Sequence, residues 1–187
     1  MIWSMLVLVL IAVILLLLIY MLSMVWPPDS PWSPWWRTSP DIARIQCKLA
    51  KIKKGEKVYD LGSGEGTALM IAAKEFGATG VGVEIDPFRV FTSRLSIRFA
   101  GLQNKLQIVR KNFFAVDVST ADVVIMYLIP KTLARLRIKL LEELKPGTRV
   151  VTFVYQIDLP LIAKDEKHEV YVYEIPKQNT KKAKIKK

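Results

Sequence analysis

The sequence is poor in the side chains that most often carry out nucleophilic, acid–base and metal chemistry. Its 187 residues include one cysteine, Cys47, and one histidine, His168. A single cysteine cannot form an internal disulfide, so an oxidising compartment has no support. Cys47 falls in a helical pattern and is expected to be a small buried residue. His168 falls near an expected turn, and neither a Ser–His–acid set nor a cluster with metal-ligand spacing can be drawn, so no metal is expected.

Charge is missing from the first 26 residues, where the apolar run from Ile2 to Trp26 is almost unbroken. A helix of about 25 residues spans roughly 37 Å, which is enough to cross a bilayer core. A cleaved signal peptide is the alternative, but the basic n-region, short apolar core and small-residue cleavage site that it needs are not seen. Because basic residues follow the span and none precedes it, the positive-inside rule predicts a single-pass membrane protein with its body on the cytoplasmic side.

Two segments flank the expected domain at residues 39–176. Residues 27–38 are rich in proline and tryptophan and are expected to form an interfacial linker, although Trp35 or Trp36 closing over a substrate pocket is the alternative. Residues 177–187 hold six lysines and no acid, and are expected to be a disordered tail drawn to anionic lipid. RNA binding is the other explanation for the net charge of +11, but a membrane span makes the lipid bilayer the simpler partner.

Residues 57–66 organise the rest of the domain. A short apolar strand runs into a loop with glycines at positions 62, 64 and 66, and a helical pattern follows at once. Alternate glycines let the chain turn tightly and leave bare main chain for a ligand, towards which the helix directs its free N–H groups. Another helix, with Ser39 as N-cap and Gly55 as its end, is expected just upstream. The pattern therefore predicts a nucleotide-type binding corner.

The spacing within this corner distinguishes between ligands. A dinucleotide fingerprint has its third glycine three residues after the second, whereas Gly66 follows Gly64 by two. A P-loop would continue with Gly-Lys-Ser/Thr, which is not present. Asp60, just before the first glycine, would repel a pyrophosphate and attract a cation. The stretch resembles motif I of the class I S-adenosylmethionine-dependent methyltransferases. That resemblance implies the cofactor S-adenosyl-L-methionine, bound by Asp60, Gly62, Ser63, Gly64 and Gly66.

The second expected strand, residues 79–85, supplies another acid. Glu84 lies at its carboxyl end, where a carboxylate can accept hydrogen bonds from both hydroxyls of a ribose. Asp86 precedes Pro87 and is expected to cap the next helix. After the third strand, at 106–110, the class commonly has an Asp that accepts from the adenine amino group. Asn112 stands there, with a carbonyl oxygen that can accept; Phe113 either packs on the adenine or belongs to the core.

The fourth expected strand, residues 121–127, ends where the class places the methyl acceptor. Methyltransferases of nucleobases and of glutamine carry Asn/Asp-Pro-Pro-aromatic at this point. This chain has Met126-Tyr127-Leu128-Ile129-Pro130 and no amide, which disfavours a nucleic acid substrate. Tyr127 offers an aromatic wall and one hydroxyl, which suits an amine acceptor, and is the candidate catalytic residue. A strand-end core position is the alternative.

The remaining residues complete an α/β pattern, with a helix at 131–144, a strand at 149–156 and a closing antiparallel hairpin within 159–175. The fold expected is the Rossmann-like class I methyltransferase sheet, mostly parallel with an antiparallel closing strand. The chain further resembles small membrane-anchored lysine methyltransferases related to those of the ATP synthase c-subunit and the adenine nucleotide translocase. That resemblance implies protein lysine N-methylation of a membrane protein. Methylation of a lipid-soluble quinone or aminolipid, and cofactor binding without catalysis, are the alternatives.

Overall fold

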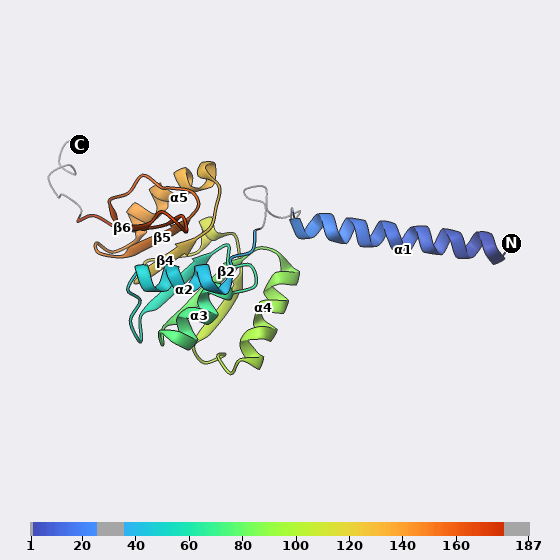
Figure 1. Cartoon of the computed structure of the whole chain (residues 1–187), viewed down its shortest axis with the longest axis horizontal. Helices are drawn as coiled ribbons and strands as arrows, with labels where there is room; N and C mark the ends of the chain where they lie inside the picture. Colours follow the sequence, from blue (N-terminus) through green and yellow to red (C-terminus); the bar gives the residue numbers. More distant parts are fainter. Residues whose placement is uncertain (1, 26–35, 178–187) are drawn as a thin grey trace. The chain divides into compact units, whose positions relative to one another are not determined.

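The computed structural model describes residues 2–25 and 36–177, and the chain divides into two units, residues 1–36 and 37–187. Most of the expected linker and all but the first residue of the expected tail lie outside the described residues. Figure 1 shows the elements, which in chain order are α1 (Ile2–Val25), α2 (Pro40–Leu49), β1 (Lys57–Leu61), α3 (Thr67–Glu75), β2 (Thr79–Glu84), α4 (Pro87–Phe99), β3 (Leu106–Arg110), the 3₁₀ helix η1 (Phe113–Ala115), β4 (Val123–Met126), α5 (Pro130–Glu143), β5 (Arg149–Phe153), β6 (Leu161–Asp165) and β7 (Val170–Glu174).

Within the first unit the structure describes one helix, α1. Its stretch Trp3–Leu22 has a mean hydropathy of 3.4 and no buried residue. Among the described residues it is the one helix long and apolar enough to cross a membrane, and a membrane anchor and a signal sequence both meet that description.

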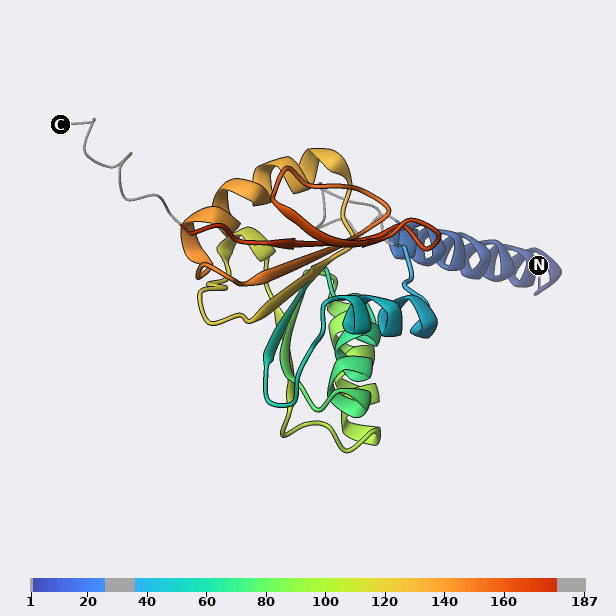
Figure 2. The ribbon, with the colours of Figure 1, turned by 60° about the vertical axis from the view of Figure 1, so that its left-hand side comes forward.

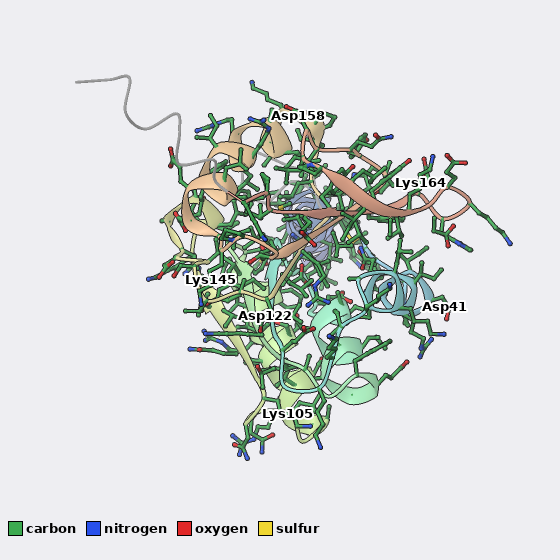
Figure 3. All side chains as sticks on the ribbon, turned by 90° about the vertical axis from the view of Figure 1, so that its left-hand side faces the viewer. Asp41, Lys105, Asp122, Lys145, Asp158 and Lys164 are labelled. Atoms are coloured by element: carbon green, nitrogen blue, oxygen red, sulfur yellow. The ribbon has the colours of Figure 1, made fainter. Side chains whose placement is uncertain are left out.

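The second unit is built on one seven-stranded sheet of order β3-β2-β1-β4-β5-β7-β6. The strands from β3 to β5 are parallel, and β7 lies antiparallel between β5 and β6. This confirms the predicted Rossmann-like sheet, including the antiparallel hairpin formed by residues 161–174. The carboxyl ends of the parallel strands therefore share one edge. Figure 3 labels Lys105, Asp122 and Lys145, which precede β3, β4 and β5 and mark the opposite edge.

Two apolar layers cover the sheet. Helices α2, α3 and α4 pack on one face and α5 on the other, as Figure 2 shows. Leucines 133, 136 and 140 of α5 are buried, as their spacing predicts. Within residues 111–122 and 154–160, all of which the structure describes, the connections contain η1 and no α-helix. The face under α5 is consequently covered by one long helix and by loops.

The sequence predicted the starts of helices more accurately than their ends. Ser39 caps α2, its Oγ accepting from the amide of Ile42 at 3.3 Å. The helix ends at Ala50, so the predicted end at Gly55 is wrong: Gly55 has φ +84° and makes the turn into β1 instead. Cys47 is fully buried, and burial raises the pKa of its thiol to about 12, which agrees with a packing role.

Candidate active site at the carboxyl edge of the sheet

The glycine loop after β1 is a tight turn held against the end of β2. Gly62, Gly64 and Gly66 have φ of +85°, +52° and +77°, a region that favours residues without Cβ. The amides of Gly62 and Ser63 donate to the carbonyl of Val83 at 2.9 and 3.1 Å. Gly66 then forms the N-cap of α3. The loop thus presents main chain, with no intervening side chain at the glycines, beside the N-terminus of a helix.

Glu84 ties this loop to the second strand. Its buried carboxylate accepts from the amide of Gly64 through Oε2 at 2.8 Å. Its Oε1 accepts from the amides of Ile85 and Asp86 at 2.8 and 2.9 Å. A carboxylate has about four lone-pair directions, so these three contacts leave room for about one more donor, such as one of the two hydroxyls of a ribose. Asp86 acts as the helix cap that the sequence predicts, accepting from the amide of Arg89 at 2.8 Å.

Asp60 lies at the end of β1, on the strand next to Glu84. The side chain is buried, and burial together with the nearby Glu84 carboxylate raises the pKa of Asp60 to about 7. Two carboxylates in a low-dielectric site attract a cation, which would favour the ionised form of both. Arg89 interacts electrostatically with Asp86 and Glu84; it is buried at the start of α4, and burial lowers the pKa of its guanidinium. No local pattern indicated that this arginine would be internal.

Ser63 has a buried hydroxyl that finds no hydrogen-bond partner among the described atoms. It lies over Gly82 of β2, since a Cβ on that glycine would be 2.7 Å from Ser63 Oγ. A buried polar atom without a partner carries a free-energy cost, which a ligand in the loop could remove.

Asn112 and Phe113 follow β3 and lie beside the end of β2, because the amide of Lys111 donates to the carbonyl of Glu84 at 3.1 Å. Asn112 caps η1, its Oδ1 accepting from the amide of Phe114 at 3.0 Å. Phe113 is half-buried against the apolar layer under α5, with its ring 5.0 Å from that of Phe114.

Tyr127 follows β4 and lies at the same edge of the sheet, next to the glycine loop. Met126 of β4 pairs in register with Leu61 of β1, so the residues that follow them, Tyr127 and Gly62, lie at neighbouring strand ends. Its half-buried ring packs edge-on against Phe153 at 4.7 Å between centroids. Burial, with the nearby Tyr155 and Glu169, raises the pKa of the Tyr127 phenol. Sequence reasoning did not find Tyr155 and Glu169 as neighbours, because they come from the loop after β5 and the β6–β7 turn and carry no local motif.

That neighbourhood contains unusual backbone. Val154 and Glu169 have φ of +64° and +53°, a region that residues other than glycine seldom adopt and that is least favourable for a β-branched residue such as Val154. The amide of Val154 donates to the carbonyl of Glu169 at 2.8 Å, so the two strained residues fix each other. Strain of this kind persists where surrounding structure enforces it, often at functional sites.

The described residues contain no group of three His, Cys, Asp or Glu side chains that could hold a metal ion. The donor set at this edge suits an organic cation instead: two buried carboxylates, a bare glycine loop and a helix N-terminus. Together with the strand order, it defines a class I S-adenosylmethionine-dependent methyltransferase. The chain belongs to the ANTKMT methyltransferase family, whose model, described as "ANTKMT methyltransferase domain", matches residues 60–160.

Similar proteins agree on this class. A protein-lysine N-methyltransferase of Saccharolobus islandicus is 39% identical over 135 residues, covering 72% of this chain and 82% of that protein. The ATP synthase c-subunit lysine N-methyltransferase of Homo sapiens is 31% identical over 104 residues; the match covers 56% of this chain and 44% of the human protein. The crystal structure of an RNA methyltransferase from Salinibacter ruber with S-adenosyl-L-homocysteine has a TM-score of 0.72 and 34% identity, covering 76% of this chain and 95% of that one.

Proposed function

We propose that this methyltransferase is a membrane-anchored protein-lysine N-methyltransferase whose acceptor is a membrane protein. The observation that carries the proposal is the match to the archaeal protein-lysine N-methyltransferase, which extends over most of both chains. The human relative's name adds that a member of this group acts on the c-subunit of ATP synthase. For this chain we propose only the class of acceptor, a membrane protein, and not the c-subunit itself.

S-adenosyl-L-methionine supplies a methyl group on a sulfonium, together with the positive charge that makes sulfur a leaving group. We assign its binding to Asp60, Glu84 and the glycine loop 62–66. The Glu84 carboxylate is held by three amides, which orients its remaining lone pair. The side-chain Oδ1 of Asn112 already accepts from the amide of Phe114, and we assign its second lone pair to an adenine amino group, with Phe113 beside it for the ring face.

The acceptor side is proposed to be the aromatic corner of Tyr127, Phe153 and Tyr155, with Glu169 at its margin. A lysine ammonium is attracted by π faces and by a carboxylate, whereas transfer requires the neutral amine. Partial burial at the aromatic rings lowers the pKa of such an amine. The Tyr127 pKa is raised, so its hydroxyl stays protonated and provides a wall and a hydrogen bond rather than a general base.

RNA methylation is the second candidate, favoured by the name of the Salinibacter ruber protein and by the net charge of +11. The end of β4 argues against a nucleobase acceptor, because Tyr127-Leu128-Ile129-Pro130 contains no amide or acid to orient a weakly basic nitrogen.

The membrane arrangement belongs to the proposal. Residues 1–26 would cross the bilayer, 27–38 would lie at its surface, 39–176 would form the catalytic domain and 177–187 would contact anionic lipid. The basic residues that follow the span, among them Arg37, Arg44 and Lys48, support a cytoplasmic catalytic domain.

One experiment separates these functions. The full chain in nanodiscs is incubated with tritiated S-adenosyl-L-methionine and, separately, with membrane proteins, lipid extract or total RNA. Label in protein that is recovered as methyl-lysine after acid hydrolysis supports the proposal. Label in RNA supports the second candidate, label in the lipid fraction a small-molecule acceptor, and cofactor binding without transfer a non-catalytic module.

A further inference from the structure

Helix α4 is apolar on two opposite faces. Val90, Ser93 and Ile97 are buried against the sheet, at the spacing of one helix face. On the opposite side Phe91, Leu95 and Phe99, four residues apart, are 63%, 41% and 82% exposed. Phe88, at the start of the same side, is 44% exposed. A helix that is hydrophobic all round is normally covered all round, and single exposed apolar residues are common whereas a row of them is not.

The segment that carries this row has charges of one sign. Residues 87–116 contain six basic side chains and no Asp or Glu. Three of the six are on α4 itself: Arg89, which is buried, and the exposed Arg94 and Arg98. Arg94 and Arg98 line a groove of about 690 Å³ between α4 and the edge strand β3, together with Gln103 and Gln107. Arg94 is held there by two hydrogen bonds from its guanidinium to the carbonyl of Ile108, at 3.1 and 2.7 Å.

We propose that the outer face of α4 is a membrane-docking surface, which inserts Phe91, Leu95 and Phe99 at the headgroup level while Arg94 and Arg98 contact the phosphates of anionic lipid. Aromatic and leucine side chains on one face with arginines beside them are the composition of helices that lie in the bilayer interface. Basic residues are each attracted to an anionic surface, and their long stems can reach headgroups while their neighbours stay in the apolar layer.

The positive charge of this surface favours anionic lipid as its partner over a second copy of this chain. A symmetric contact through α4 would bring Arg94 and Arg98 of two copies towards each other, without an acidic residue anywhere in 87–116 to pair with them. Docking through α4 would also hold the carboxyl edge of the sheet at a fixed distance from the membrane, because α4 begins directly after residues 84–86 at that edge.

The test uses the full chain in nanodiscs of phosphatidylcholine, with or without anionic phosphatidylglycerol, and a fluorophore on α4. Ser96→Cys carries the label on an exposed position of the helix, while Cys47 is buried and does not compete. Ile138→Cys, on the exposed side of α5 and 59% exposed, is the matched label site. Quenching by spin-labelled lipid reports depth, and circular dichroism confirms that each variant is folded.

We expect the label at position 96 to be quenched several-fold more in anionic than in neutral nanodiscs, and the difference to shrink in high salt. Phe91→Ser with Phe99→Ser should reduce quenching to the level of the label at position 138. The proposal is overturned if positions 96 and 138 are quenched alike in anionic nanodiscs. It is also overturned if the label becomes protected only when membrane proteins are added, or only when a nanodisc holds two copies.

Discussion

Asp60 is a carboxyl group whose ionisation is unfavourable in the protein without ligand. Burial and the Glu84 carboxylate raise its pKa to about 7, whereas an unfolded Asp ionises near 3.9. Between these two values the folded chain binds more protons than the unfolded one. The Asp60 contribution to the free energy of unfolding therefore falls as pH rises through this window. A cationic ligand at Asp60 acts in the opposite direction, because it stabilises the ionised form.

The first prediction follows from this linkage. If binding of S-adenosyl-L-methionine needs ionised Asp60, its affinity should increase about tenfold from about pH 6 to about pH 8, with release of a proton. Calorimetry in two buffers of different ionisation enthalpy measures both quantities. Asp60→Asn should weaken binding, remove the pH dependence and raise the melting temperature of the free protein at the higher pH. Equal affinities at both pH values in the wild-type chain would remove Asp60 from the cofactor site.

The second prediction concerns Tyr127, whose ring contacts Phe153 and whose phenol stays protonated at neutral pH. Tyr127→Phe keeps the wall and should retain turnover to within a few-fold. Tyr127→Ala opens the corner to water and should lower kcat by about ten- to a hundredfold, since misplacing an acceptor is costly. Initial rates with a lysine peptide, alongside the cofactor Kd as control, measure this. If turnover is unchanged in both variants, Tyr127 is not at the site.

At the scale of single residues, the sequence was enough to propose those site residues that carry a local pattern. Asp60, the three loop glycines and Glu84 follow from strand, turn and helix spacing. It could not predict that Glu84 would bind the Gly64 amide, or that Glu169 would lie near Tyr127. The first contact joins residues that are 20 positions apart in the sequence. The second joins the turn between β6 and β7 to the end of β4. Only the assembled sheet brings them together.

Packing between β2 and α3 depends on two glycines. A Cβ on Gly80 would lie 2.6 Å from Leu69 Cδ2 and 2.8 Å from the carbonyl oxygen of Val58. A Cβ on Gly82 would lie 2.5 Å from Ile108 Cδ1 and 2.7 Å from Ser63 Oγ. Both positions are therefore closed to larger residues, but only the second touches the glycine loop.

The third prediction uses this pair as variant and control. Gly80→Ala and Gly82→Ala should each destabilise the domain by about 1 to 3 kcal/mol through overpacking. Gly82→Ala should in addition weaken cofactor binding, because it displaces Ser63 within the loop, whereas Gly80→Ala should leave the Kd nearly unchanged. Thermal unfolding and calorimetry at a temperature where both variants are folded make the comparison. Equal Kd values for the two variants would contradict the link from Gly82 to the loop.

Helix starts were predicted well where a capping side chain marks them. Ser39 and Asp86 cap helices as expected, and β3 has its predicted bounds. The end of α2 was missed because Gly55 is a turn residue five positions beyond the cap at Ala50. The place of β7 between β5 and β6 also has no local signal, since it depends on which strand edges remain to be paired.

The whole chain combines an apolar helix with a domain that has its own core. Residues 37–187 form a separate unit with two apolar layers, whose members come from residues 42–175. The domain should therefore fold and bind cofactor without the first 36 residues. Any contribution of α1 to activity would then come from tethering, which raises the local concentration of a membrane-bound acceptor.

The fourth prediction tests this division of labour. A chain beginning at Arg37 should bind S-adenosyl-L-methionine with a Kd within about twofold of the full chain, and should methylate a soluble lysine peptide at the same rate. Its rate on an acceptor embedded in the same nanodisc should fall by about a hundredfold or more, because the second encounter is no longer intramolecular. A fused unrelated membrane helix should restore that rate, since tethering requires no specific contact. Unchanged rates on the embedded acceptor would mean that α1 serves as a signal or has another role, and that the domain finds its substrate from solution.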